Sequence, residues 1–425
     1  MKERIRIGYV GLGRRGSSML HGCFAQMSDV EIAALCDTDS TKIDKAVEKL
    51  QENGYTAPAR YTDYSQMLAT EKLDAVVIMT GWNSRISYAI EAMEAGLYTA
   101  IEVGCAYNLS ECYALVDTYE RTHSPVMMLE NCCYGRREMM ALRMAKEGLF
   151  GEIVHCTGGY RHYLNNCELF RKNEDGTFRV DNQHYRLAEY IHRNCEQYPT
   201  HELGPIAKVL NINRGNRMLK LRSFSSKAKG LSSFMRDHVA GENPFADKNV
   251  NQGDIVTTII DCAGGEQILL TLDTTLPRAF YSRDFTIRGT KGLCQESERD
   301  VCTYFLEGME EGCFNNEKEF FEKYDHPLHA EYASQERGGH GGMDWLVVRA
   351  FVESVKNGTP VPIDAYDTAT LLAIAPLSEA SLAQDGAPVE FPDFTRGKWF
   401  HREPVVPQKY SLDIIFEDPS TPITP

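Results

Sequence analysis

The stretch Ile5-Arg-Ile-Gly-Tyr-Val-Gly-Leu-Gly-Arg-Arg-Gly16 decides the fold of this chain. An alternating apolar strand leads into three glycines, and a helix-like segment follows. In such a pattern Gly11 permits a tight turn, Gly13 lets a pyrophosphate approach the backbone, and Gly16 lets the helix pack close to the strand. The phosphates then meet N–H groups at the helix N-terminus. The stretch predicts a dinucleotide-binding turn.

An acidic residue follows at the spacing that such a turn requires. A second apolar strand, over 30–36, ends at Asp37, and a carboxylate about 20 residues beyond the glycines hydrogen-bonds the adenosine ribose in this class of site. A carboxylate at this position repels a 2′-phosphate, so the sequence favours NAD over NADP. A lone glycine motif is weak evidence, but here strand, helix, second strand and acid follow in order.

Strand-like and helical patterns alternate through the first third of the chain. Strands are predicted over 5–10, 30–36, 74–80, 98–103 and 126–129, with helices near 15–27, 40–52, 84–95 and 110–122. This alternation predicts a parallel sheet covered on both faces, and hence a Rossmann domain over residues 1–131. Ligands bind at the carboxyl ends of such strands. The residues that follow two of these ends are Trp82, Asn83, Ser84, Arg85, Glu102 and Val103.

The pattern changes beyond residue 131. A helix is predicted near 136–147, a strand over 152–160, an irregular charged stretch near 164–196, a hairpin over 255–275, a strand over 284–288, and helices over 343–357 and 366–384. We therefore expect an α/β protein in which residues 132–425 form a second, α+β domain with an open, mainly antiparallel sheet and helices on one face. An open sheet also offers a surface for a homodimer.

Composition restricts the partners of this 425-residue chain. A net charge of −15 disfavours binding to nucleic acid or to anionic membranes, so a small-molecule substrate is expected. The 13 cysteines are never spaced as C-x-x-C, which predicts reduced thiols and neither a zinc site nor a disulfide framework. No secretory signal precedes the first strand, and no apolar run approaches the roughly 18 residues of a membrane span. A cytoplasmic location is the expectation.

The densest cluster of reactive side chains is Asn194-Cys-Glu-Gln-Tyr198-Pro199-Thr200-His201-Glu-Leu-Gly-Pro205. Tyr198 and His201 point into one cavity if a helix begins after the proline, and histidine is well suited to proton transfer near neutral pH. Alternatively, His201 only caps that helix or hydrogen-bonds to it. The segment begins like the zinc motif H-E-x-x-H, but Pro205 stands where the second histidine should be, so no metal is expected.

Four other positions admit both a functional and a structural interpretation. Tyr160 and Tyr281 are suited to act as a base or to hydrogen-bond a sugar, or they are packing residues. Arg186 either grips a substrate oxygen or lies on the surface. The run Gly338-Gly-His340-Gly-Gly-Met-Asp344 either lets backbone approach a ligand closely or is a flexible loop before a helix capped by Asp344.

Together these residues resemble a known family. The N-terminal half resembles the Gfo/Idh/MocA superfamily of NAD(P)-linked sugar oxidoreductases. Later segments resemble glycoside hydrolase family 109, whose founding activity is α-N-acetylgalactosaminidase; they are Tyr198-Pro-Thr-His201-Glu-Leu-Gly-Pro205, Asn211-Ile-Asn-Arg-Gly215, Tyr281-Ser-Arg283, Gly289-Thr-Lys-Gly292 and His340-Gly-Gly-Met-Asp344. The resemblance implies NAD contacts from Arg14, Arg15, Asp37, Trp82, Asn83, Ser84, Arg85, Glu102, Val103 and Asn131. It implies sugar contacts from Tyr160, Arg186, Tyr198, Pro199, Thr200, His201 and Tyr281.

The resemblance also implies a mechanism, which is retaining hydrolysis by temporary oxidation of the sugar at C3. NAD-dependent glycosidases are an exception to the two-carboxylate scheme. Tyr160 would remove the C2 proton and His201 would assist proton transfer, or the two roles would be exchanged. Superfamily dehydrogenases carry Glu-Lys-Pro where this chain has Glu102-Val-Gly104, so the lysine that assists hydride transfer is missing. A net sugar dehydrogenase and a non-catalytic NAD or sugar sensor are the alternative functions.

The resemblance fails at one segment close to the expected sugar site. Family 109 members tend to read Tyr-x-His-Asp-Leu-Arg, whereas this chain reads Tyr160-Arg-His162-Tyr163-Leu-Asn165. The histidine is kept, while the acid and the arginine are not. The family resemblance therefore does not settle which sugar, or which anomer, is bound.

Overall fold

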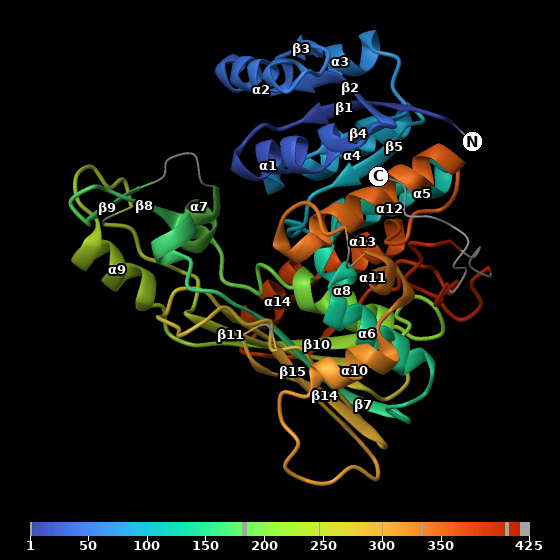
Figure 1. Cartoon of the computed structure of the whole chain (residues 1–425). Helices are drawn as coiled ribbons and strands as arrows, with labels where there is room; N and C mark the ends of the chain where they lie inside the picture. The colour runs from blue at the N-terminus through green and yellow to red at the C-terminus, as the bar shows by residue number, and fades with distance from the viewer. Residues whose placement is uncertain are drawn as a thin grey trace. The chain divides into compact units, whose positions relative to one another are not determined.

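A computed structural model describes residues 2–180, 185–245, 247–299, 301–332, 335–403 and 408–416. Contacts group the chain into two compact units. The first comprises residues 1–146, 324–372 and 402–425, and the second comprises residues 147–323 and 373–401. Figure 1 colours the chain along its length. Within the described ranges, no helix has the length and apolar character needed to cross a membrane.

The first unit contains a six-stranded parallel sheet with the order β3-β2-β1-β4-β5-β6. Its strands are β1 (Ile5–Val10), β2 (Val30–Cys36), β3 (Ala59–Tyr61), β4 (Ala75–Ile78), β5 (Tyr98–Ile101) and β6 (Val126–Met128). The connecting helices are α1 (Arg14–Gly22), α2 (Ser40–Glu52), α3 (Tyr64–Thr70), α4 (Trp82–Glu94) and α5 (Leu109–Thr122), with the short turn η1 (Phe24–Gln26). The predicted Rossmann fold is confirmed. Strand β3 and helix α3 are absent from the predicted elements, because both are short and β3 has no fully buried residue.

Later segments of the chain also belong to the first unit. They are η2 (Asn131–Tyr134), α6 (Arg136–Lys146), α11 (Pro327–Tyr332), η4 (His340–Gly342), α12 (Met343–Asn357) and α13 (Ala365–Leu372). Helix α12 is fixed by Arg349, a completely buried side chain that donates to both carboxylate oxygens of Asp29 at 2.8 and 2.6 Å. Each unit therefore consists of several separate segments of the chain. The predicted domain division, in contrast, cuts the chain once, after residue 131.

The prediction of a single helix over 366–384 is wrong. The structure has two helices there, and they belong to different units. Helix α13 ends at Leu372, and α14 (Ile374–Leu382) begins two residues later. Pro376 has no N–H to donate to the carbonyl of Leu372, and its ring crowds that carbonyl. The freed carbonyl accepts a hydrogen bond from the backbone N–H of Ala106 at 3.2 Å instead.

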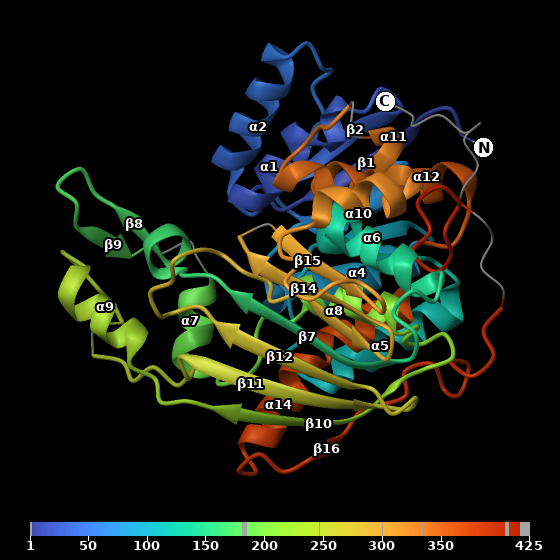
Figure 2. The ribbon, with the colours of Figure 1, turned by 60° about the horizontal axis from the view of Figure 1, so that its bottom comes forward.

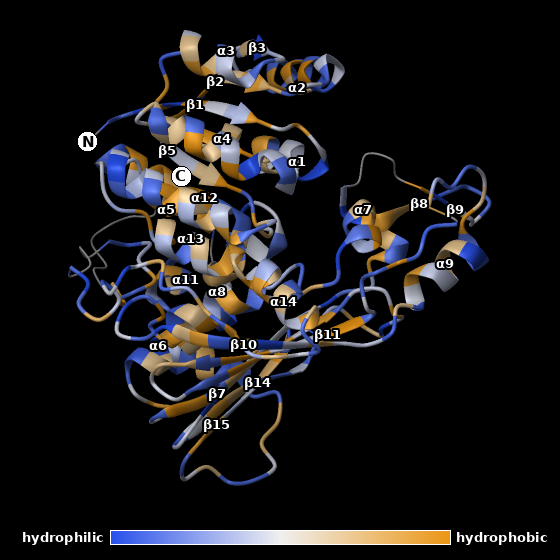
Figure 3. Ribbon diagram, turned by 180° about the vertical axis from the view of Figure 1, so that it is seen from behind, coloured by the Kyte–Doolittle hydropathy of each residue, from blue (hydrophilic) through white to orange (hydrophobic). Residues whose placement is uncertain are grey.

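The second unit contains an eight-stranded sheet with the order β15-β14-β13-β7-β12-β11-β10-β16. Its strands are β7 (Ile153–Arg161), β10 (Met218–Ser225), β11 (Ile255–Cys262), β12 (Gln267–Asp273), β13 (Thr286–Gly289), β14 (Gly292–Glu298), β15 (Val301–Leu306) and β16 (Val389–Glu390). Only the β7–β12 pair among them is parallel, which confirms the mainly antiparallel sheet. Buried and more exposed residues alternate along β11, and the strands of this sheet carry both hydrophobic and hydrophilic residues (Figure 3).

Helices α8 (Thr200–Val209) and α14 pack on this sheet, against β7 and β10 respectively (Figure 2). Helix α10 (Glu317–Tyr324) lies mostly in the same unit. Glycine at position 158 allows α8 to come close, because a Cβ there would lie 2.5 Å from the Cβ of Glu202.

The stretch predicted as irregular near 164–196 contains ordered elements. They are the π-helical turn η3 (Asn165–Leu169), β8 (Phe170–Lys172), β9 (Phe178–Val180) and α7 (Tyr185–His192). With α9 (Gly230–His238) they form a lobe beyond the ends of the sheet strands (Figure 2). Its small core is aromatic, with the ring of Phe234 lying 5.2 Å from Phe170 and 5.0 Å from Phe178. Aromatic packing therefore stabilises the helices and strands of this segment, whose many charged residues gave no clear helix or strand periodicity.

Candidate active site

The glycine-rich turn has the backbone geometry that a dinucleotide site requires. Gly11 has φ +94°, and a Cβ there would lie 2.8 Å from the backbone carbonyl carbon of Met79. A Cβ at Gly16 would collide with the carbonyl oxygen of Gly11, whereas one at Gly13 would meet nothing within 4 Å. Gly13 is also the N-cap of α1, and no side chain caps the helix there. The open space above Gly13 and a helix N-terminus without a side-chain cap fit a pyrophosphate.

Asp37, which directly follows β2, stabilises this turn through its side chain. Its carboxylate accepts hydrogen bonds from the backbone N–H of Leu12 at 2.7 Å and of Asp39 at 3.0 Å. The sequence predicted only a ribose contact for this residue. A carboxylate held in place by two backbone donors is oriented before any ligand arrives.

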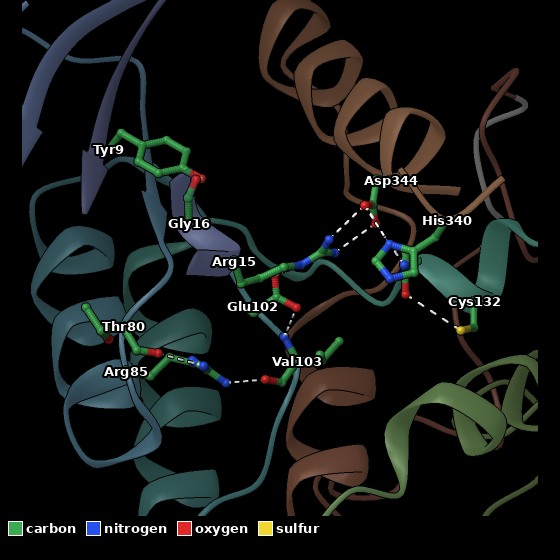
Figure 4. Close-up of polar contacts among 11 residues, drawn as sticks. Tyr9, Arg15, Gly16, Thr80, Arg85, Glu102, Val103, Cys132, His340 and Asp344 are labelled. Atoms are coloured by element: carbon green, nitrogen blue, oxygen red, sulfur yellow. Dashed lines mark hydrogen bonds and ion pairs between the residues drawn. The ribbon is translucent and has the colours of Figure 1, made fainter. Parts of the chain in front are cut away.

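Helix α4 fixes the carboxyl ends of β4 and β5. The buried guanidinium of Arg85 donates to the backbone carbonyl of Thr80 at 2.7 Å and to that of Val103 (Figure 4). Gly104 has φ +157°, and a side chain there would collide with the indole of Trp82. Trp82 and Arg85 are thus buried beneath the strand ends, while Asn83 is exposed and Ser84 is half-buried. Asn83 and Ser84 are the more accessible of the four predicted cofactor contacts on this helix.

A cluster of charged side chains lies beside the turn (Figure 4). Arg15 donates to the Asp344 carboxylate at 2.7 and 2.8 Å and to Glu102 at 3.2 Å. Asn131 donates to Asp344 at 2.8 Å, and Nδ1 of His340 lies 2.8 Å from the same carboxylate. Burial alone would raise the pKa of Asp344, but hydrogen bonds and charge from Arg15 and His340 hold this pKa well below its ordinary value. The cluster therefore carries a permanent negative charge at Asp344.

The structure corrects one interpretation of this segment. Asp344 does not cap α12, whose N-cap is Gly342 without a side-chain hydrogen bond. His340, Gly341 and Gly342 all have positive φ, of 54°, 62° and 88°, so the backbone turns sharply to bring Asp344 to Arg15. Arg14 is exposed at the turn itself.

In the second unit, four predicted sugar-site rings form one group. Tyr160 lies near the end of β7, and its ring centroid is 4.5 Å from Tyr198, 5.7 Å from His201 and 6.0 Å from Tyr281. The rings of Tyr198 and His201 are 5.0 Å apart. Pro199 occupies the N-cap position of α8, and its side chain makes no capping hydrogen bond. Thr200 is the first residue of the helix and is buried. His201 is inside α8, so the interpretation that it caps this helix is wrong.

Arg186 joins the same group from α7 in the lobe. Its side chain is buried, and its guanidinium carbon lies 4.3 Å from the ring centroid of Tyr198 and 5.9 Å from that of Tyr160. It forms an ion pair with Glu168 of η3 at 3.0 Å. Arg186 is therefore not a surface arginine, and the folding of the lobe is what brings it to the rings.

The ionisation of this group depends mainly on burial. Burial raises the pKa of Tyr160, and the charge of Arg186 opposes that rise. Burial lowers the pKa of His162, whose imidazole is therefore neutral at pH 7. The hydroxyl of Tyr160 lies 3.2 Å from Nδ1 of His162. A phenol, an imidazole and a guanidinium at these separations are suited to moving a proton and to binding hydroxyl groups.

Comparisons with known proteins assign both parts of the chain. Residues 5–130 match the model described as "Oxidoreductase family, NAD-binding Rossmann fold". Residues 134–401 match "Glycosyl hydrolase 109, C-terminal domain". The two matches define the class of this protein. It combines an NAD-binding Rossmann domain of the oxidoreductase type with the C-terminal domain of a glycosyl hydrolase.

Individual relatives agree with these matches. The chain is 38% identical over 418 residues to an α-N-acetylgalactosaminidase of Tannerella forsythia, covering 94% of this chain and 88% of that protein. It is 37% identical to a glycosyl hydrolase family 109 protein of Parabacteroides distasonis, covering 94% of this chain and 89% of that protein. An NAD-binding oxidoreductase from Klebsiella pneumoniae shares the fold, with TM-score 0.69, 15% identity and coverage of 92% and 100% of the two chains. The chain belongs to glycosyl hydrolase family 109 and is an NAD-dependent glycoside hydrolase.

Proposed function

We propose that the substrate is an α-N-acetylgalactosaminide, and that it is hydrolysed with retention of configuration by transient oxidation at C3. The 38% identical relative from Tannerella forsythia that carries this activity in its name supports the choice of sugar. The single observation that carries the proposed chemistry is the grouping of Tyr160 and His201, whose ring centroids lie 5.7 Å apart beside Tyr198 and Arg186.

Residues of the first unit would hold NAD. They are Gly11, Gly13, Arg14, Arg15, Gly16, Asp37, Trp82, Asn83, Ser84, Arg85, Glu102, Val103 and Asn131. Bound NAD would supply a hydride acceptor that is regenerated within each turnover, so it would not be consumed. Val103 replaces the lysine of related dehydrogenases, which favours a recycled cofactor over net oxidation.

Residues of the second unit would handle protons and orient the sugar. A ketone at C3 makes the C2 proton acidic enough for Tyr160 to remove, and the aglycone then leaves from C1. His201 would transfer a proton at the C3 oxygen or at the leaving oxygen. Arg186, Tyr198, Pro199, Thr200 and Tyr281 would bind the sugar hydroxyls and the ring face. The roles of Tyr160 and His201 can be exchanged without altering the rest of the scheme.

Nitrophenyl α- and β-glycosides of N-acetylgalactosamine, N-acetylglucosamine and galactose, incubated with the enzyme in deuterated water, test this proposal. We expect cleavage of the α-N-acetylgalactosaminide, deuterium at C2 of the released sugar, and no accumulation of NADH. Release of phenol without C2 deuterium would overturn the mechanism. Accumulation of NADH from the free sugar would indicate a net dehydrogenase instead.

Two finer proposals concern assembly and location. Ile259 and Leu269 pair across β11 and β12 and are only half-buried, while their neighbours Ile260 and Leu270 are buried on the opposite face. This apolar pair supports a homodimer through the sheet, and sedimentation of Leu269→Glu beside the wild type would test it. None of the 13 cysteines, all of which are among the described residues, is in a disulfide, which supports a reducing, cytoplasmic location. Fractionation of the native host would test the location.

A further inference from the structure

His162 is the residue beside the proposed base to which no role has been given. It follows the end of β7, and its backbone N–H donates to the carbonyl of Asp273 at 2.9 Å. Because Tyr160 and His162 are two residues apart on an extended segment, their side chains project to the same side. Their rings meet edge to face at 5.7 Å.

A buried tyrosine makes a poor base while it keeps its own proton. Burial raises the pKa of Tyr160, so the phenolate form is scarce at neutral pH. For Tyr160 to accept the C2 proton of a sugar, its hydroxyl proton must move to another group in the same step. The hydrogen bond to Nδ1 of His162, at 3.2 Å, provides a path for that proton.

The contacts of His162 are compatible with the tautomer that accepts a hydrogen bond at Nδ1, since the Cys167 thiol donates to the backbone carbonyl of Tyr163 at 3.2 Å and leaves its sulfur as an acceptor. Nε2 of His162 lies 3.7 Å from the sulfur of Cys167, a weak acceptor. With the proton on Nε2, Nδ1 presents a lone pair to the Tyr160 hydroxyl. The Tyr281 ring packs on the imidazole with a centroid distance of 5.0 Å, which fixes its orientation.

We propose that His162 positions the Tyr160 hydroxyl and holds its proton while Tyr160 deprotonates the sugar at C2. This inference rests on the proposed function. The C2–H bond breaks and a new O–H bond forms on Tyr160, while the phenolic proton passes to Nδ1 of His162. The electron pair of the C2–H bond forms the C1–C2 double bond, and the aglycone leaves with the pair of its bond to C1. His162 becomes an imidazolium, and it returns the proton by the reverse path when water adds at C1.

Burial and the charged groups around His162 act on its pKa in opposite directions. Glu168 of η3 raises the pKa of His162, while Arg186 of α7 and His201 of α8 lower it, and burial lowers it most. Tyr160, Cys167 and Tyr281 also contact the imidazole. The imidazole is thus neutral at rest, and Glu168 partly compensates the charge when His162 becomes protonated.

The variant His162→Gln tests the proposal, because glutamine accepts a hydrogen bond but takes no proton at neutral pH. We expect kcat to fall at least about 10²-fold with little change in KM or in NAD binding. We also expect the acid limb of the pH profile to disappear and the residual rate to rise with pH. Added imidazole should partly restore His162→Gly. The control His155→Gln, on the same strand, should keep wild-type rates.

A measurement without substrate or NAD separates this inference from the proposed function. In protein labelled with ¹⁵N-histidine, Nδ1 of His162 should resonate as an unprotonated acceptor, and its signal should shift in Tyr160→Phe. A protonated Nδ1, or a His162→Gln enzyme with full turnover or an unchanged pH profile, would overturn the inference. A failure of the proposed function would give a different result, because the wild-type enzyme would then cleave the glycoside in deuterated water without incorporating deuterium at C2.

Discussion

Arg15 in the glycine-rich turn donates two hydrogen bonds to Asp344, which lies 329 positions further along the chain. The Asp344 side chain is 3% exposed and the Arg15 side chain 31% exposed. Glu102, Asn131 and His340 share the same cluster. This ion pair ties the predicted cofactor turn to the N-terminus of α12, two segments of the first unit that the sequence separates widely.

We expect Arg15→Met to lower the free energy of unfolding by about 2–3 kcal/mol, because it leaves a buried carboxylate with fewer partners. The double variant Arg15→Met/Asp344→Leu should lose less than the sum of the two single variants, since it removes both charges. Urea unfolding of the four proteins measures the coupling. Additive losses would contradict an energetic link between the two residues.

The alanine variants of Gly13 and Gly104 should separate ligand binding from folding. Gly13→Ala places its Cβ in open space, so the melting temperature of the apoprotein should stay unchanged while NAD affinity falls at least about 10-fold from loss of close phosphate approach. Gly104→Ala meets the indole of Trp82 and needs φ +157°, so it should destabilise the fold by more than about 2 kcal/mol. Calorimetric titration with NAD and thermal unfolding measure the two effects. Unweakened NAD binding by Gly13→Ala would contradict the cofactor site.

Glu196 should make the protein less stable as pH rises. Burial raises the pKa of this 1%-exposed glutamate to about 8, whereas an unfolded glutamate ionises near about 4.3. Between these two values the folded state holds a proton that the unfolded state has lost, so stability falls with rising pH. Glu196→Gln should flatten this slope and, at pH 8, exceed the wild type by more than about 1 kcal/mol. Urea unfolding from pH 5 to 9 measures the slope, and parallel curves for the two proteins would contradict the assignment.

Tyr160→Phe and His201→Ala should each lower turnover at least about 10²-fold, the usual scale of acid–base contributions, with NAD still bound. Initial rates with the nitrophenyl glycoside and titration with NAD measure the two properties separately. Tyr55→Phe, at an exposed site in the first unit, should behave as the wild type. Full activity in both active-site variants would remove the proposed proton-transfer roles.

Much of the fold could be predicted because the deciding patterns are local. The strand, glycine turn, helix and acid over 5–37 are read from residues close in sequence, and buried strands such as 75–78 appear as continuous apolar runs. Predictions were wrong or incomplete where the structure of a segment depends on features that its hydrophobic periodicity does not show, such as an internal proline or contacts with residues distant in sequence. Pro376 divides a continuous apolar pattern into α13 and α14, and the lobe near 164–196 is ordered by aromatic residues distant in sequence.

The sequence by itself determined the Rossmann fold, the preference for NAD, the family resemblance and the residue types available for chemistry, because each depends on spacing along the chain. Only the tertiary structure decided that Arg15 pairs with Asp344, that Arg186 is buried against Tyr198, and that His162 faces the Tyr160 hydroxyl. Those contacts depend on how helices and strands pack. Packing is the sum of many weak, non-local interactions that no single stretch of sequence encodes.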